Sequence, residues 1–279
     1  MYPPKFGYVI PDSLDEALEF LEKNEDARPL AGGYSLIPML KLRLIRPSYI
    51  VELRRLNDLH YIKSDDKTLY LGALATHNEI ATDQKVKKSV PVVSAVSSVI
   101  ADPQIRNMGT IGGELAQADP VTDHPASLLV TEAKVKIKSK GNERIVPFEG
   151  FQKDIYTTDL KTGELIVEVQ VPILKGYTYS YKRMEDTAAV AVLLRKEGEV
   201  IKDVRIAASL IGPVGTRLRE AEKVLMDSKG DSKSIEEASK KAMESVNPIP
   251  SPRASAEYKK KLVGVYTKRA LLEAMGGKQ

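Results

Sequence analysis

The chain carries the glycine-rich stretch Ala31-Gly32-Gly33-Tyr34-Ser35, and a second one, Thr110-Ile111-Gly112-Gly113-Glu114, follows further along. We expect each stretch where a strand runs into a loop. Glycine lets the main chain approach a ligand closely and adopt positive φ, so that successive N–H groups face an anion. Two such loops in one domain suit a ligand with two phosphates, and the hydroxyls of Ser35 and Thr110 add donors. The alternative is that each glycine pair is only a tight turn.

The spelling of these stretches excludes two common nucleotide sites. Neither stretch is GxGxxG or a Walker loop, so neither a Rossmann nor a P-loop fold is expected. Asp123 follows the second stretch closely. Its carboxylate can accept hydrogen bonds from the hydroxyls of a sugar. It can also begin a helix as N-cap, because an apolar run follows it. Both interpretations stay open.

The composition excludes several other classes of protein. Of 279 residues, 42% are hydrophobic and 29% charged, and 42 Lys and Arg against 38 Asp and Glu leave a net charge of +4. This small, dispersed excess argues against nucleic acid as a partner. No apolar run approaches the ~20 residues of a membrane helix. The N-terminus lacks the apolar segment of a secretory signal, so we expect a cytoplasmic protein without a membrane span.

Cysteine is absent from the chain, and histidine occurs at positions 60, 77 and 124 alone. The chain therefore offers no disulfide, no thiolate nucleophile and no thiolate ligand for an iron–sulfur cluster. The histidines have no HxH or HExxH spacing, so we expect no metal centre. We expect His124 on the surface or at a helix cap, and no catalytic residue among the three. Abundant Lys and Glu with few Asn and Gln favour a thermophilic source.

Hydrophobic periodicity predicts a mixed chain. Helices are expected at residues 13–23, 35–44, 91–101 and 123–133. Strands are expected at residues 28–31, 49–53, 68–73 and 164–171, with a hairpin at 134–138 and 144–147. The sequence pattern changes near residues 172–176, where we place a domain boundary. After it, an antiparallel meander is expected at residues 177–182, 188–195 and 200–210, followed by helices at 216–227, 234–246 and 256–275.

Several motifs together resemble a known family. They are the stretch from Leu30 to Lys41, Ala101 to Arg106, Thr110 to Gly113, and Ala118-Asp119-Pro120. In this order they resemble the medium, FAD-binding subunits of molybdenum hydroxylases, including those of carbon monoxide dehydrogenase and of archaeal glyceraldehyde or aldehyde oxidoreductases. The flavin segment of xanthine dehydrogenase is a more distant likeness. The resemblance covers nearly the whole chain.

The resemblance implies an α+β fold. Its first part is a two-lobed FAD-binding domain of the p-cresol methylhydroxylase / vanillyl-alcohol oxidase type, at residues 1–173 with lobes at about 1–56 and 57–173. A C-terminal flavoprotein domain with a small antiparallel sheet and helices, residues 174–279, completes the chain.

The resemblance also assigns binding residues for FAD. Asp123 would bind an FAD hydroxyl, and Ile100 would lie against the isoalloxazine ring. Ile166 and Lys182 match positions that contact the flavin or the nucleotide. Non-covalent attachment is expected, because there is no cysteine and no histidine at a recognisable linkage position. Residues that would hold the pyrophosphate are Ala31, Gly32, Gly33, Tyr34, Ser35, Thr110, Ile111, Gly112, Gly113 and Glu114. Among these, Tyr34 stands where many relatives have histidine, and Glu114 where many have asparagine.

The implied function is electron transfer in a heterotrimeric oxidoreductase. A large subunit would carry the molybdenum cofactor, and a small subunit would carry two [2Fe–2S] clusters that pass electrons to FAD on this chain. The FAD would then reduce an external acceptor, with aldehyde oxidation of the glyceraldehyde type as the expected reaction. A dimer of such heterotrimers is one arrangement that the resemblance allows. The alternatives are a carbon monoxide dehydrogenase-type medium subunit, a self-contained FAD-dependent oxidase, and a non-catalytic nucleotide-binding scaffold.

Overall fold

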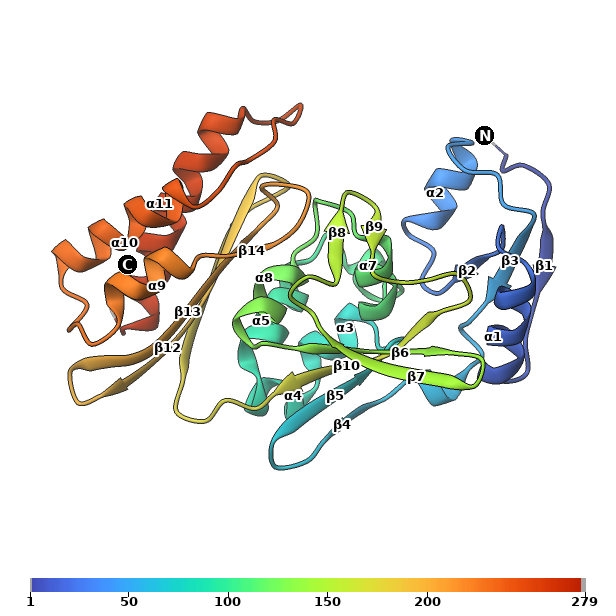
Figure 1. Ribbon diagram of the computed structural model, residues 1–279, viewed down its shortest axis with the longest axis horizontal. Coiled ribbons are helices and arrows are strands. Elements are labelled where there is room, and N and C mark those ends of the chain that lie inside the picture. The colour runs from blue at the N-terminus through green and yellow to red at the C-terminus, as the bar shows by residue number, and fades with distance from the viewer. Residues whose placement is uncertain (1, 277–279) are drawn as a thin grey trace.

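Three main β-sheets follow one another along the length of the molecule (Figure 1). The structure is a computed structural model, and it describes residues 2–276. About 35% of the chain is helical and 28% is strand, so the expected α+β fold is confirmed. A fourth, two-stranded sheet is formed by β8 (Gln152–Asp154) and β9 (Thr157–Thr158).

The N-terminal sheet has three strands in the order β1 (Gly7–Val9), β3 (Tyr49–Glu52) and β2 (Arg28–Leu30), and both pairings are parallel. Helix α1 (Leu14–Lys23) begins where the Ser13 hydroxyl accepts a hydrogen bond from the Glu16 amide. Its apolar face packs on the sheet, as its periodicity predicts.

Helix α2 (Leu36–Lys41) follows β2 and is shorter than predicted. The expected helix of residues 35–44 ends early because Arg43 has a φ of 58°, a left-handed conformation that a helix cannot continue through. At the other end of the helix, residues 31–35 are irregular between β2 and α2.

The central sheet has five antiparallel strands and is flanked by short helices. Its strand order is β4 (Ile62–Ser64), β5 (Thr68–Gly72), β10 (Leu165–Pro172), β6 (Lys134–Ser139) and β7 (Asn142–Pro147). The predicted hairpin is thus present as β6 and β7. The helical segments between β3 and β6 are η1 (Asn57–Leu59), α3 (His77–Thr82), α4 (Gln84–Ser89), α5 (Pro91–Val99), α6 (Pro103–Arg106), α7 (Ile111–Gln117) and α8 (His124–Val130).

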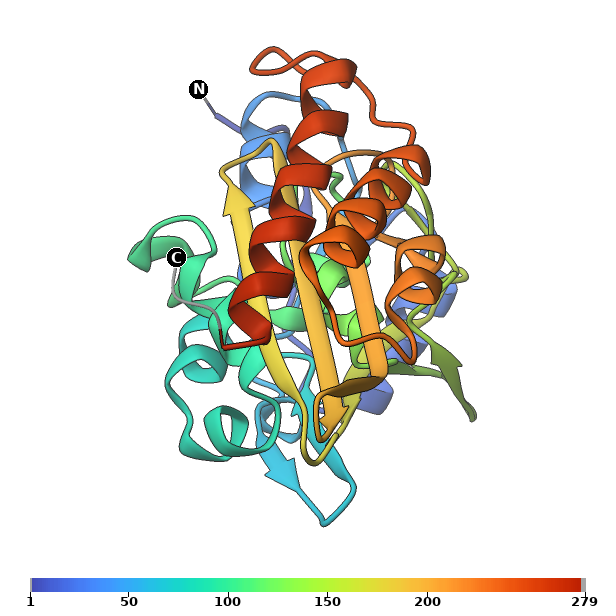
Figure 2. The same cartoon turned by 90° about the vertical axis from the view of Figure 1, so that its left-hand side faces the viewer.

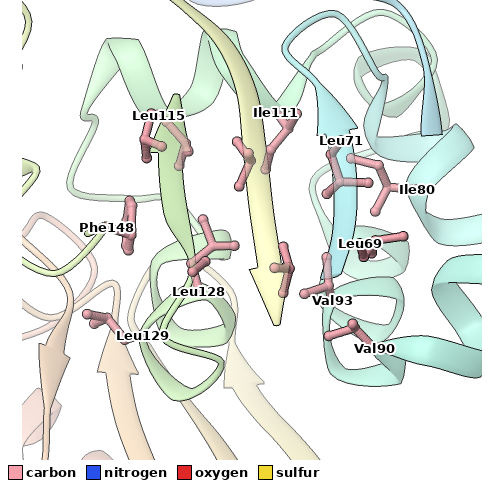
Figure 3. Close-up of a cluster of buried hydrophobic side chains, with 14 of the residues drawn as sticks. Leu69, Leu71, Ile80, Val90, Val93, Ile111, Leu115, Leu128, Leu129 and Phe148 are labelled. Atoms are coloured by element: carbon pink, nitrogen blue, oxygen red, sulfur yellow. The ribbon is translucent and has the colours of Figure 1, made fainter. Parts of the chain in front are cut away.

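The largest hydrophobic core lies between this sheet and its helices (Figure 3). Figure 3 shows Leu71 of β5 pointing toward Ile80 of α3, while Ile111 and Leu115 of α7 join the same cluster beside the neighbouring strands. All four side chains are fully buried. This core fixes the start of α7, which carries the second glycine stretch.

Leu71→Ala should lower the free energy of unfolding by about 3 kcal/mol, because it removes buried methyl groups and leaves a cavity that the surrounding sheet fills only in part. Urea denaturation followed by circular dichroism measures the change. Leu44→Ala is the matched control, since Leu44 is 68% exposed and its loss should cost less than about 0.5 kcal/mol. Equal effects of the two substitutions would show that this core is misassigned.

The C-terminal sheet is the predicted antiparallel meander, β11 (Thr178–Met184), β12 (Ala188–Glu197) and β13 (Val200–Ser209), extended by β14 (Thr216–Arg217). One face packs on the central core through Ala191, Leu193 and Ala207. The other face is covered by three helices (Figure 2). These are α9 (Arg219–Leu225), α10 (Ser232–Glu244) and α11 (Ala256–Ala274).

The helix predicted at residues 216–227 begins later than expected. Residues 216 and 217 pair with β13 instead, with Arg217 opposite Ala207. The Arg217 guanidinium also bonds to the Glu222 carboxylate in α9. Pairing with the neighbouring strand therefore overrides the local helical pattern.

Candidate functional site

A cavity of 1190 Å³ is lined by residues of all three main sheets, among them Pro29 of β2, Ile166 of β10 and Arg183 of β11. Both glycine stretches contribute to its wall. The volume exceeds that of a typical site for a drug-sized molecule, so the cavity suits a large ligand.

The two glycine stretches pack directly against one another. A Cβ at Gly32 would lie 2.1 Å from the Met108 carbonyl oxygen, which is a backbone clash. A Cβ at Gly113 would lie 3.8 Å from Cβ of Ala31. Glycine at position 32 is thus required for the close approach of the two main chains. The sequence predicts these stretches in one domain, and the structure brings them together.

The first stretch presents free backbone donors. Gly33 has a φ of +82°, which turns the chain between β2 and α2. Within the described part of the chain, none of the amide groups of residues 32–36 donates a hydrogen bond. Tyr34 is half-exposed, and residues 31–36 all line the cavity. Amides with no internal partner beside a cavity are suited to anionic oxygens.

The second stretch is built differently, and the expectation of a loop is wrong here. Thr110 is the N-cap of α7, and its hydroxyl accepts a hydrogen bond from the Gly113 amide at 3.2 Å. The amides of Ile111 and Gly112 donate to Ala75 and Ala73. These two amides already donate hydrogen bonds within the fold, so the second stretch does not present a row of free amide donors to a ligand.

Two members of the second stretch differ in what they offer a ligand. The Ile111 side chain is fully buried in the hydrophobic core and does not line the cavity. Gly112 does line it, and a Cβ there would lie 2.6 Å from Cβ of Ala73. Thr110, Gly112 and Gly113 line the cavity, so these three residues can contact a pyrophosphate as predicted, through the surface that they expose there.

Asp123 occupies the N-cap position of α8, but its side chain makes no capping bond. Its carboxylate instead accepts a hydrogen bond from the Tyr181 hydroxyl and lies 3.2 Å from Nε of Arg183. Burial raises the pKa of this carboxyl to about 6, although Tyr181 and Arg183 act in the opposite direction. Burial likewise raises the pKa of the Tyr181 phenol well above its ordinary value. The carboxylate lines the cavity, where a hydroxyl donor would stabilise its charge.

Lys182 and Arg183 are neighbours in β11 and point to opposite faces of the strand. The resemblance predicts that Lys182 contacts the cofactor, but its ammonium lies 2.7 Å from the Glu273 carboxylate of α11, on the face of β11 away from the cavity. The neighbouring Arg183 lines the cavity and also donates to the Val99 carbonyl. Sequence reasoning misses Arg183 and Tyr181, although the period of two in a strand places them on one face and Lys182 on the other.

The remaining predicted residues lie on the cavity wall. Ile100 is nearly buried at the end of α5, beside Ala101 with a φ of 41°. Ile166 of β10 is also nearly buried and lines the same cavity.

Glu114 lines the cavity, and its carboxylate lies between two imidazoles. Its carboxylate lies 2.8 Å from Nδ1 of His124 and accepts the His124 amide at 3.1 Å, and it lies 3.6 Å from Nε2 of His77. Burial alone raises the pKa of the Glu114 carboxyl, but His124 leaves it below its ordinary value. Burial lowers the pKa of His77 to about 4. The expectation that His124 lies at the surface is wrong, because its side chain is fully buried.

Comparison with known proteins agrees with this geometry. Residues 4–174 match the family described as the FAD binding domain in molybdopterin dehydrogenase, and residues 175–274 match the CO dehydrogenase flavoprotein C-terminal domain. The chain belongs to the FAD-binding medium subunits of the molybdenum hydroxylase family. It is an oxidoreductase subunit, as the resemblance implies.

Individual relatives of this medium subunit are similar along their whole length. The glyceraldehyde dehydrogenase medium chain of Sulfolobus acidocaldarius is 38% identical, over 98% of this chain and 99% of the relative. The carbon monoxide dehydrogenase medium chain of Hydrogenophaga pseudoflava is 33% identical, over 97% of each. A solved structure of carbon monoxide dehydrogenase from Hydrogenophaga pseudoflava, in a form lacking the Mo-pyranopterin moiety, superposes with a TM-score of 0.96 at 34% identity over 99% of both chains.

No helix among residues 2–276 of this medium subunit combines the length and the apolar character needed to cross a bilayer.

Proposed function

We propose that this chain is the electron-transfer subunit of a heterotrimeric molybdenum hydroxylase. A small subunit with two [2Fe–2S] clusters would deliver electrons to FAD held here, and a large subunit with the molybdenum cofactor would act on the substrate. The observation that carries the proposal is the large cavity with the unpartnered amides of residues 32–36 on its wall. Zero cysteines fit this division, because the clusters then require thiolates from another chain.

The residues that line the cavity fit the parts of FAD. The amides of residues 32–36 would bind pyrophosphate oxygens, with Thr110, Gly112 and Gly113 closing the opposite side. Asp123 would accept a hydrogen bond from an FAD hydroxyl, and Arg183 would hold that carboxylate in place. Ile100 and Ile166 would supply apolar contacts to the cofactor.

We also propose that residues 1–173, with lobes at about 1–56 and 57–173, form the FAD-binding domain, and that residues 174–279 form the C-terminal domain. Residues 1 and 277–279 of these ranges lie outside the described part of the chain. The junction of the two family matches between residues 174 and 175 supports this division.

FAD, when bound, supplies a carrier that accepts electrons from one partner and passes them to another. This chain's residues bind and orient it and exclude water from its buried parts. Aldehyde oxidation of the glyceraldehyde type is the favoured overall reaction, since the Sulfolobus acidocaldarius relative is named for it. A carbon monoxide dehydrogenase-type role is the second candidate, because relatives of that name also match over nearly the whole chain.

Copurification from the native source tests the assembly. We expect the chain to emerge in a complex with two other subunits, containing FAD, molybdenum and iron in fixed ratios. Dimerisation of that complex is then read from its mass. A flavin-containing chain that purifies alone, without molybdenum or iron, would contradict the proposal and favour a self-contained oxidase. A chain without flavin absorbance would favour the non-catalytic scaffold.

The FAD should be attached non-covalently, because the chain lacks cysteine and both His77 and His124 face Glu114. Precipitation of the purified chain with acid should release all of the yellow colour into the supernatant. Flavin absorbance that remains with the washed pellet would reveal a covalent link. A sample to which free FAD is added just before precipitation controls for trapping.

A further inference from the structure

His77 is a buried imidazole without a hydrogen bond. Its side chain is 4% exposed, and Nδ1 is a buried atom without a hydrogen-bond partner among residues 2–276. The other ring nitrogen, Nε2, lies 3.6 Å from the Glu114 carboxylate, which is too far for a direct bond. Nε2 therefore faces this carboxylate without bonding to it and is open to a ligand placed between the two groups.

His124 contacts the same carboxylate as His77. The Ser97 hydroxyl donates to the Val93 carbonyl at 2.8 Å, and Nε2 of His124 lies 3.0 Å from the same hydroxyl oxygen. Because the single hydroxyl hydrogen is used, Nε2 of His124 is the donor in this contact. Nδ1 of His124 lies 2.8 Å from the Glu114 carboxylate, so a ring nitrogen of each imidazole is directed at this one carboxylate.

We propose that His77, Glu114 and His124 form a binding site for a divalent transition metal of the zinc class. The three ligand atoms lie within 4.8 Å of one another. Two ligands of one tetrahedral zinc ion lie about 3.3 Å apart, so the 3.6 Å between His77 and Glu114 needs little adjustment, and the 2.8 Å between Glu114 and His124 opens slightly. Two imidazoles and one carboxylate are a ligand set that zinc prefers.

The surroundings also fit a metal. Ser97 orients His124 through Nε2, as outer hydrogen-bond partners commonly do for metal-bound histidine. His77 and Glu114 both reach the cavity, which gives an entry path and room for a water molecule as fourth ligand. Metal binding would replace the hydrogen-bond contact between Nδ1 of His124 and the Glu114 carboxylate. The metal would bind beside the proposed FAD site and not depend on it.

The test is zinc binding by the full-length chain. Protein is first stripped with a chelator, and zinc sulfate is then titrated in competition with a chromophoric chelator, with elemental analysis of the product. We expect one zinc per chain. Glu114→Gln and His77→Gln should each weaken zinc binding by at least about 100-fold, and Ser97→Ala by about 10-fold, because it removes only an orienting contact. His60→Asn is the control, since that exposed histidine pairs with Glu79 outside the cluster.

A thermal shift keeps the test informative if a variant folds poorly. Zinc should raise the Tm of the parent chain and of His60→Asn, but not that of His77→Gln. Binding of less than one zinc per chain, or equal zinc affinity in parent and Glu114→Gln, would overturn the proposal and leave a proton and a bridging water in the cluster. FAD content, measured in the same samples, reports on the cofactor site separately.

Discussion

Gly33→Val should weaken FAD binding by more than about 100-fold. Position 33 has a φ of +82°, which a β-branched residue strongly disfavours. A Cβ there would also lie 2.7 Å from Cδ1 of Ile37. Relief of this strain must turn the backbone, and the free amides of residues 32–36 would turn with it. Hydrogen bonds to a charged group contribute about 1.5–3 kcal/mol each, so the loss of two accounts for the effect.

Gly198→Val separates local strain from loss of the site. Gly198 lies in the turn between β12 and β13, has a φ of +61°, and would place a Cβ in open space. This substitution shares the backbone strain but lies outside the cavity wall, so FAD affinity should stay within about 3-fold of the parent, the scatter expected for a distant site. Flavin fluorescence, titrated into flavin-free protein, measures both variants. A folded Gly33→Val protein with full flavin occupancy would show that the pyrophosphate binds elsewhere.

Much of the fold follows from local signals in the sequence. The meander of β11 to β13 is predicted because apolar runs of strand length are separated by turn residues such as Gly198. The capping box of Thr76 and Glu79 is present at the start of α3, where side chain and backbone of both residues bond reciprocally. Such elements are determined by residues close in the sequence.

The site is less predictable because long-range packing decides it. The amides of Ile111 and Gly112 look free in the sequence, but Ala75 and Ala73 of a distant segment accept their hydrogen bonds. His124 is polar and follows a turn that contains proline, yet Ser97 of α5 and Glu114 of α7 enclose it. No local pattern reports these partners. The difference between Arg183 and Lys182 can be predicted from the sequence, because strand alternation places the two side chains on opposite faces of β11.

The isolated, FAD-loaded chain should not oxidise glyceraldehyde. Oxidation of an aldehyde requires activation of the substrate and removal of a hydrogen, and a nucleophilic thiol is absent from the sequence. Two of the carboxylates that line the cavity are already paired with other side chains. Asp186 bonds to Arg253, and Asp123 is held by Tyr181 and Arg183. None of these is placed as a free general base.

The turnover of the isolated chain is to be compared with that of the copurified complex. Glyceraldehyde turnover with a dye acceptor should be at least about 1000-fold lower for the isolated chain than for the copurified complex, a loss within the range that missing acid–base groups alone can produce. As a control, FAD on the isolated chain is reduced with dithionite, and the same dye should reoxidise it. That control shows that the flavin is competent, so an absent turnover reflects the missing subunits. Comparable turnover in the two samples would reject the electron-transfer assignment and establish a self-contained oxidase.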